Sequence, residues 1–110
     1  MVTSDNVTLQ DFAVVNANGD AIKSKGANNI SFIRVKTEWT GGPKTTNGAY
    51  GLYPVESENI LIDDCVAIGA SDAGIYVGQS KNIIVKNSFV KHNVAGIEIE
   101  NSFYADVFDN

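Results

Sequence analysis

The sequence has only one cysteine, one histidine and two prolines among its 110 residues. One cysteine cannot form an internal disulfide, so the sequence contains no disulfide framework and does not define a redox compartment. Basic residues are also few: eight Lys and Arg against thirteen Asp and Glu give a net charge of −5. A surface of this sign repels phosphate groups on average, which argues against nucleic acid and anionic membranes as partners.

Long apolar runs are missing as well. No stretch is long enough to span a bilayer, and the first residues, MVTSDN, lack the basic and apolar regions of a signal peptide. With 44 % hydrophobic and 19 % charged residues, the composition is that of an ordinary globular domain. We therefore expect a single segment over residues 1–110, with the limited core that a chain of this length can bury.

What the sequence does contain is an internal repeat. The stretch from Asn59 to Lys81 and the stretch that begins at Asn82 share one order of features: Asn, an alternating apolar run, a polar turn, a Gly-Ile pair and a second turn. A repeat of about 20 to 50 residues is typical of solenoids, in which each unit buries its apolar face only by stacking on its neighbours.

Two sets of anchor pairs define the length of one coil. The first set is spaced by 23, 30, 23 and 22 residues, and the second by 30, 23 and 22. The pairs are Asn6-Val7, Asn29-Ile30, Asn59-Ile60, Asn82-Ile83 and Tyr104-Ala105 in the first set, and Ala21-Ile22, Gly51-Leu52, Gly74-Ile75 and Gly96-Ile97 in the second. Both sets predict coils of about 23 residues that start near residues 6, 29, 59, 82 and 104, with an insertion over about residues 38–50.

Equivalent positions of successive coils carry apolar residues with a period of two. The first position after the anchor holds Val7, Ile30, Ile60 and Ile83, and the third holds Leu9, Phe32, Ile62 and Val85. Period two is the alternation of a β-strand, and identical columns indicate parallel strands stacked in register. The predicted fold class is all-β, a single-stranded parallel β-helix (β-solenoid) of about four and a half coils. A left-handed hexapeptide helix is disfavoured, because the strict six-residue repeat is absent.

One corner of each coil carries a polar residue. These residues are Asp11, Arg34, Asp64, Asn87 and Asp109. Asn and Asp bond neighbouring backbone amides at turns and tolerate left-handed geometry, so we interpret this column as scaffold. Cys65 falls in an inward column and is expected to be a small core residue, since free cysteines are usually buried.

The residues from Asn59 to Ser102, NILIDDCVAIGASDAGIYVGQSKNIIVKNSFVKHNVAGIEIENS, resemble the repeats of bacterial parallel β-helix proteins. Together with GAYGLYPVESENILI upstream, they are similar to the right-handed parallel β-helix repeat-containing family. The resemblance covers residues 6–110 and implies a right-handed solenoid, a secreted or periplasmic parent protein and further coils on both sides, so that this chain is a truncated segment. It does not select a function, because such helices include pectate lyases, polygalacturonases, alginate epimerases and non-catalytic carbohydrate-contacting proteins.

Self-association is expected from the two ends and from the outward columns. No stretch of the sequence reads as a cap for the terminal coils, and uncapped coils expose apolar surface and strand edges. Outward positions also carry apolar residues, and the candidate interface residues are Ile33, Leu61, Ile84, Phe89 and Phe108. The alternative is that strands favour β-branched and aromatic residues on either face.

The aromatic residues define a candidate binding face. The insertion holds the only tryptophan, Trp39, and ends at Tyr50, while Tyr53 and Tyr76 occupy one outward column in adjacent coils. Loops that interrupt a solenoid often lie on its binding face, and flat rings beside hydrogen-bonding groups suit the faces and hydroxyls of sugars. These four residues are therefore predicted to bind carbohydrate. The alternative is that Trp39 and Tyr50 pin the loop to the coil and that the Tyr pair is an ordinary cross-strand contact.

Catalytic residues are not identified by any motif. The acidic candidates are Asp63, Asp64, Asp72, Glu98 and Glu100, and the basic ones are Lys86, Lys91 and His92. A lyase needs a base and a cation, and a hydrolase needs two carboxylates beside one bond, but the spacing of these residues singles out neither. No zinc spacing or calcium-binding nonapeptide occurs, so no cofactor or metal is expected. We predict a structural or binding segment that contacts polysaccharide, with a fragment of a polysaccharide-processing enzyme (lyase, hydrolase or epimerase) as the alternative.

Overall fold

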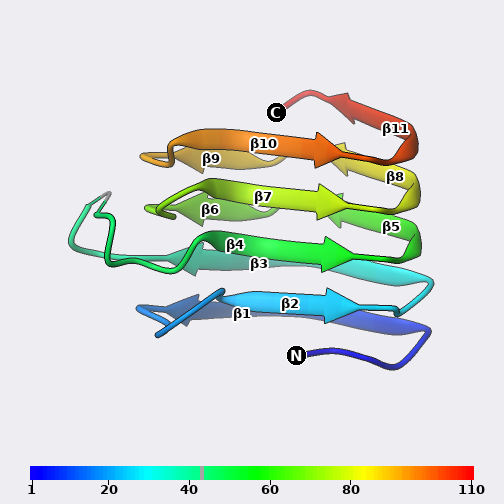
Figure 1. Ribbon diagram of the computed structural model, residues 1–110, viewed down its shortest axis with the longest axis horizontal. Helices are drawn as coiled ribbons and strands as arrows, with labels where there is room; N and C mark the ends of the chain where they lie inside the picture. The colour runs from blue at the N-terminus through cyan, green and yellow to red at the C-terminus, as the bar shows by residue number, and fades with distance from the viewer. Residues whose placement is uncertain (43) are drawn as a thin grey trace.

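A computed structural model describes residues 1–42 and 44–110 as a stack of β-strands joined by tight corners (Figure 1). The strands are β1 (Val7–Val15), β2 (Ile22–Lys25), β3 (Ile30–Glu38), β4 (Tyr50–Val55), β5 (Glu58–Asp63), β6 (Val66–Ile68), β7 (Ala73–Gly78), β8 (Lys81–Lys86), β9 (Phe89–Lys91), β10 (Ala95–Glu100) and β11 (Phe103–Phe108). Among these described residues, no helix is long and apolar enough to cross a membrane.

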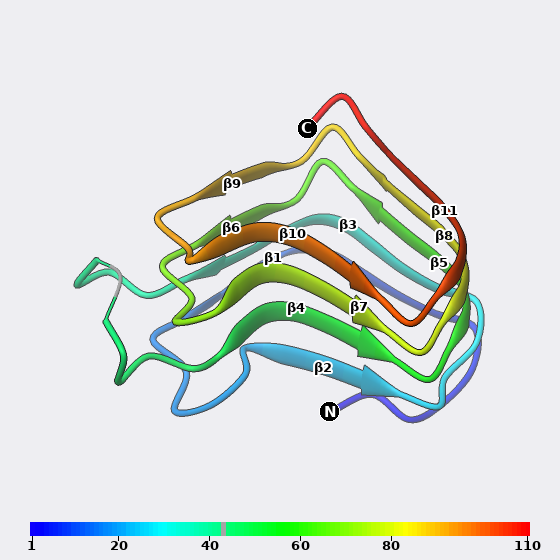
Figure 2. The same cartoon turned by 45° about the horizontal axis from the view of Figure 1, so that its top comes forward.

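The strands form two sheets that face each other across the core (Figure 2). The front sheet has four strands in the order β10-β7-β4-β2, and the back sheet has seven, along the path β11-β8-β5-β3-β6-β9 with β1 paired to β3. Every pairing is parallel, and paired strands lie one coil apart in the chain. The chain is therefore a β-solenoid, as the repeat predicts.

The inward columns of the sequence form the core. Ile30 pairs with Ile60 and Ile60 with Ile83, and all three are at most 2 % exposed. In the front sheet Leu52 pairs with Ile75, and both are fully buried. The predicted columns are confirmed. Each of these buried aliphatic side chains contributes about 1.5–3 kcal/mol of hydrophobic free energy, which only a stacked neighbour makes available.

Left-handed residues turn the chain at its corners. The predicted corner column from Asp11 to Asp109 has φ values between 50° and 59°, including Arg34 at 50°. A second corner places the anchor column in the same region, with φ of 59° or 60° at Asn6, Asn29, Asn59, Asn82 and Tyr104. Asn and Asp tolerate this region better than other side chains, which explains why they recur once per coil.

The anchor asparagines form a ladder along the stack. The Nδ2 group of Asn29 donates to Oδ1 of Asn6 at 2.7 Å, Asn59 donates to Asn29 at 2.8 Å, and Asn82 donates to Asn59 at 3.2 Å. Each bond joins two adjacent coils. The ladder stops at Asn82, because the next coil has Tyr104 at this position.

A column of serines closes the corner between the front and back sheets. The hydroxyl of Ser80 donates to the carbonyl of Gly78 at 2.8 Å and accepts the N–H of Ser57 at 3.2 Å. Ser102 repeats this arrangement one coil later, with Glu100 as acceptor and the N–H of Ser80 as donor. The hydroxyls thus satisfy the N–H groups of Ser57 and Ser80, and they add a second bond to carbonyls that also accept a backbone N–H.

Cys65 lies in the core, as expected. It is 1 % exposed, and its thiol donates to the carbonyl of Phe32 at 3.3 Å. Burial raises the pKa of the thiol, so the neutral form is favoured over the thiolate. The interpretation of Cys65 as a small core residue is confirmed.

Candidate functional site

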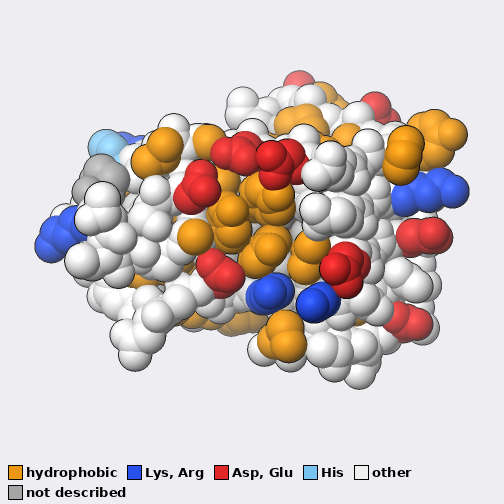
Figure 3. All heavy atoms as spheres, viewed as in Figure 1, with side chains coloured by type: hydrophobic (Ala, Val, Ile, Leu, Met, Phe, Trp, Pro, Cys, Tyr) orange, Lys and Arg blue, Asp and Glu red, His pale blue; other side chains and the backbone are white. Residues whose placement is uncertain are grey.

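Three tyrosines lie together on the outer surface of the front sheet. Tyr50 and Tyr53 belong to β4, and Tyr76 belongs to β7 in the next coil. Their ring centroids are 4.6 Å apart for Tyr50 and Tyr53, 4.5 Å for Tyr50 and Tyr76, and 5.3 Å for Tyr53 and Tyr76. We call these residues the tyrosine cluster. In Figure 3, apolar side chains gather over the middle of this sheet, with acidic side chains above and basic side chains below.

Glycines next to the tyrosines explain how the rings reach this surface. A Cβ atom on Gly51 would lie 2.4 Å from Oγ1 of Thr37, so this position faces the interior and only glycine fits there. A Cβ atom on Gly78 would lie 2.8 Å from Cε1 of Tyr76. The absence of a side chain at Gly78 therefore allows the Tyr76 ring to lie against the sheet.

Charged side chains border the tyrosine cluster on both sides. Lys23 pairs with Tyr53 across β2 and β4, and its Nζ lies 4.9 Å from the centroid of the Tyr53 ring. Glu98 pairs with Tyr76 across β10 and β7. The predicted outward column, with a lysine at one end and a glutamate at the other, is confirmed.

The pKa values of Tyr50 and Tyr76 are both raised. The hydroxyl of Tyr76 donates to the carboxylate of Glu100, and this bond, together with burial, raises the pKa of Tyr76. Burial also raises the pKa of Tyr50, and the carboxylate of Asp72 raises it further. The neutral hydroxyl is thus favoured at Tyr50 and Tyr76, which lie beside the carboxylates of Asp72 and Glu100.

The four predicted carbohydrate-binding residues do not all reach this surface. Tyr50 and Tyr53 are half-buried, and Tyr76 is 8 % exposed because the other two rings and the sheet cover it. Trp39 is only 4 % exposed, contrary to the expectation that it presents its ring to a ligand, and its Nε1 donates to the carbonyl of Ala17 at 2.9 Å. Trp39 therefore pins the insertion to the coil. Pro43 of the insertion lies outside the described residues.

Hydrogen bonds of Asn47 hold part of the insertion in place, one within the insertion and one to the next coil. Asn47 donates from Nδ2 to the carbonyls of Gly42 at 3.0 Å and Gly69 at 2.7 Å. A Cβ atom on Gly69 would lie 2.7 Å from the carbonyl oxygen of Trp39, so the loop packs closely on the next coil. These contacts place the loop against the corner of the stack and leave the tyrosine cluster uncovered.

The candidate catalytic residues are spread over the molecule. Asp63 ends β5 and Asp64 follows it at the corner of the back sheet, whereas Asp72 and Glu98 are near the tyrosine cluster. His92 is exposed at another corner, with φ of 58°. Within residues 1–42 and 44–110, no three His, Cys, Asp or Glu side chains group closely enough to hold a metal ion.

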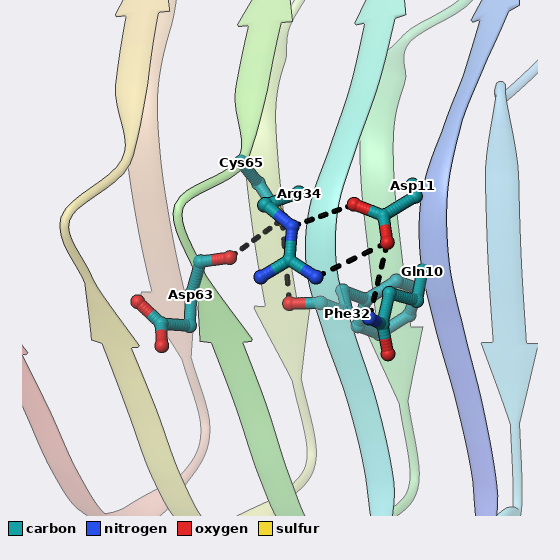
Figure 4. Close-up of polar contacts among 6 residues, drawn as sticks. All are labelled: Gln10, Asp11, Phe32, Arg34, Asp63 and Cys65. Atoms are coloured by element: carbon teal, nitrogen blue, oxygen red, sulfur yellow. Dashed lines mark hydrogen bonds and ion pairs between the residues drawn. The ribbon is translucent and has the colours of Figure 1, made fainter.

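The corner column carries one ion pair. Nε of Arg34 lies 2.6 Å from Oδ1 of Asp11, and Nη2 donates to Oδ2 at 3.1 Å (Figure 4). The Arg34 hydrogen bond, together with one from Gln10, lowers the pKa of the Asp11 carboxyl. Both side chains are exposed, so this pair joins two coils at the surface and contributes little to stability.

The predicted interface residues occupy several parts of the surface. Ile84, Phe89 and Phe108 are exposed, and Ile33 and Leu61 are half-buried. Of these, Leu61 and Ile84 are direct neighbours on the outer surface of β5 and β8.

Two hollows that the sequence interpretation missed flank the corner at Lys81 and Asn82. The first, of about 390 Å³, is lined by Asn59, Ile60, Leu61, Asn82, Ile83, Ile84, Tyr104 and Asp106. The second, of about 490 Å³, is lined by Asn28, Glu56, Ser57, Glu58, Gln79, Ser80, Lys81, Asn101 and Phe103. The signal in the sequence is the pair Phe103-Tyr104, which places two aromatic rings in columns that are otherwise polar.

Comparison with known proteins adds the family. The profile of the family described as "Right handed beta helix region" matches residues 1–110. No curated protein and no solved structure matches the chain. The expected right-handed β-helix is thereby confirmed, and the fold on its own leaves the function open.

Proposed function

Because this chain belongs to the right-handed β-helix family, we propose that it is a binding segment of a β-solenoid and that its tyrosine cluster contacts carbohydrate. The observation that carries the proposal is the contact among Tyr50, Tyr53 and Tyr76 on one outer surface. Tyrosine combines an apolar ring with a polar hydroxyl, so it can pack against the C–H face of a sugar and bond its hydroxyls.

The residues around the cluster suit a ligand that runs along the stack. Lys23, Tyr53, Tyr76 and Glu98 follow one another in four successive coils. With strands about 4.8 Å apart, this column extends over roughly 14 Å, which favours an oligosaccharide over a single sugar. Glu98 offers acceptors and Lys23 offers donors to hydroxyl groups at the two ends of the column.

The test is the substitution Tyr53→Ala, measured by calorimetric titration with oligosaccharides that the wild-type chain binds in a glycan array. Loss of the half-buried ring is expected to weaken binding about tenfold, equivalent to ~1.4 kcal/mol. Phe89→Ala is the matched control, because Phe89 is an exposed ring on the back sheet and its loss is expected to leave affinity unchanged. Equal affinities for Tyr53→Ala and the wild type would contradict the proposal.

The same sugars distinguish binding from catalysis. A binding segment leaves the oligosaccharide intact, whereas a lyase produces unsaturated uronates and a hydrolase produces new reducing ends. We expect neither product after prolonged incubation. Either product, if lost in an Asp72→Asn or Glu98→Gln variant, would assign the chain to the enzyme class instead.

We also propose that the chain self-associates. Phe12 and Val107 belong to inward columns, yet they are 40 % and 45 % exposed, since β1 and β11 each pair with the strands of one neighbouring coil among the described residues. Phe89 and Phe108 add exposed rings. Sedimentation velocity over a wide concentration range is expected to reveal oligomers that Val107→Lys weakens. A monomer at the highest concentration would refute this proposal.

A further inference from the structure

The hollow of about 390 Å³ lies on the outer surface of the back sheet and is lined from β5, β8 and β11. Figure 2 shows these three strands one above the other. One of its walls is the anchor column, with Asn82 followed by Tyr104. The other wall is an outward column in which Leu61 pairs with Ile84 and Ile84 with Asp106. The hollow therefore belongs to a different sheet from the tyrosine cluster and does not depend on it.

Tyr104 occupies a position where the scaffold prefers asparagine. The other coils have Asn in this column, and three side-chain hydrogen bonds join them into the ladder. Tyr104 adopts the same left-handed conformation, with φ of 59°, which is unfavourable for a bulky side chain. Its side chain adds no bond to the ladder, and the residue is 74 % exposed. Such strain at the edge of a hollow suggests that the ring has another role.

Two hydrogen-bond acceptors at the hollow, on Asn82 and Asp106, have no side-chain partner among the described residues. Asn82 donates from Nδ2 to Asn59 at 3.2 Å, and its Oδ1 receives no bond from any side chain in the described part of the chain. Asp106 forms no ion pair with any residue the structure describes. A ligand with hydroxyl groups can donate to these two acceptors, and it can also bond the Tyr104 hydroxyl, which both donates and accepts.

The remaining surface of the hollow is apolar. Leu61 and Ile84 present aliphatic side chains, and Tyr104 presents an aromatic ring at the wall. The volume lies within the range of small-molecule sites, about 300–1,000 Å³. An apolar face combined with donors along one edge is the chemistry of a pyranose ring, whose C–H face packs on apolar groups while its hydroxyls donate.

We propose that this hollow is a second ligand site, which binds one neutral hexopyranose between Tyr104 and Ile84 with its hydroxyls directed to Asn82 and Asp106. A second copy of the chain is a poorer occupant, because an apolar partner surface would bury the carboxylate of Asp106 without a donor. The sugar satisfies both acceptors and covers the apolar side chains at the same time.

The decisive variant is Tyr104→Asn, which restores the column residue and removes the ring. We expect its melting temperature to rise by about 4 °C, because the left-handed strain is relieved and the ladder gains a bond. We expect its affinity for neutral hexoses to fall at least tenfold. Binding is measured by NMR titration with glucose, galactose and mannose, and glycerol serves as a polyol without a ring face. In the wild type, saturable shifts are expected at β8 and β11 with the hexoses and not with glycerol.

Three further variants distinguish binding in this hollow from binding elsewhere on the chain. Asp106→Asn is expected to weaken hexose binding several-fold without removing the ring, whereas Phe103→Ala, at the neighbouring hollow, is expected to leave it unchanged. Tyr53→Ala is expected to retain the shifts at β8 and β11, so failure of the tyrosine-cluster proposal leaves this one standing. Wild-type affinity in Tyr104→Asn, equal shifts with glycerol, or no shifts with any hexose would overturn the proposal. So would a concentration-dependent dimer that buries Ile84 in place of the sugar.

Discussion

Strands β7 and β11 have the same length and opposite environments. All six residues of β7, AGIYVG, are buried, and all six of β11, FYADVF, are exposed. β11 has more aromatic residues than β7, so amino-acid composition does not explain why β7 is buried and β11 is exposed. Among the described strands, β7 pairs with β4 and with β10, whereas β11 pairs with β8 alone. The number of neighbouring coils thus determines how far a strand is buried. Each coil is stabilised mainly by its contacts with the coils stacked on it.

The largest expected effect on stability comes from truncating an inward aliphatic side chain in a central coil, compared with a similar truncation in the last coil. Ile75→Ala removes a fully buried side chain from β7 and is expected to cost about 2–5 kcal/mol, because the surrounding coils cannot collapse into the space. Val107→Ala removes part of a half-exposed side chain from β11 and is expected to cost less than ~1 kcal/mol. Urea denaturation measures both. Equal losses would contradict the dependence of burial on stacking.

A smaller effect is expected at the serine column, which offers the same comparison for a polar group. Ser80→Ala leaves the N–H of Ser57 without a partner in a buried corner, at a cost of about 1–3 kcal/mol, and it removes one of two bonds to the carbonyl of Gly78, which still accepts the N–H of Glu56. Ser102→Ala changes the equivalent hydroxyl one coil later, where water reaches the backbone, and is expected to cost less than ~0.5 kcal/mol. The two variants are compared by thermal unfolding at one pH. A larger loss for Ser102→Ala than for Ser80→Ala would refute the account of this corner.

The smallest effect concerns the Tyr76 hydroxyl and its dependence on pH. Its pKa is raised in the folded chain above the ordinary value of 10.0, since it donates to Glu100 and is buried. A group whose pKa is higher in the folded chain contributes its full stabilisation at pH values below its pKa in the unfolded chain. This contribution is lost as the pH rises through its pKa in the folded chain. Stability is therefore expected to fall above about pH 10 in the wild type and less steeply in Tyr76→Phe. Parallel pH profiles of the melting temperature for the two proteins would contradict the role of this bond.

The columns could be predicted because their physics is local and repeated. Inward apolar residues alternate with period two inside each strand. Between strands they recur once per coil, as Val7, Ile30, Ile60 and Ile83 do, so one register of the strands buries all of them. The pairing of Tyr53 and Tyr76 in adjacent coils follows from the same register. Proximity of these two rings was thus accessible from the sequence.

Trp39 and Tyr104 could not be placed in this way. The insertion has no counterpart in the other coils, so nothing in the repeat indicates that Trp39 turns inward and bonds Ala17. Tyr104 is predicted from the sequence as one of the anchors. Its position after the asparagine ladder and beside the hollow is known only from the structure. The positions of Trp39 and Tyr104 depend on side-chain contacts between coils that occur once in the molecule and do not repeat from coil to coil.

The sequence alone determined the coil length, the inward columns and the corners, because alternation and left-handed tolerance are properties of short segments repeated along the chain. The tertiary structure decided which aromatic rings stay exposed, how the insertion folds back and where the surface is hollowed. Those features arise where side chains from separate coils meet, and their sizes and contacts are fixed only once the coils are stacked.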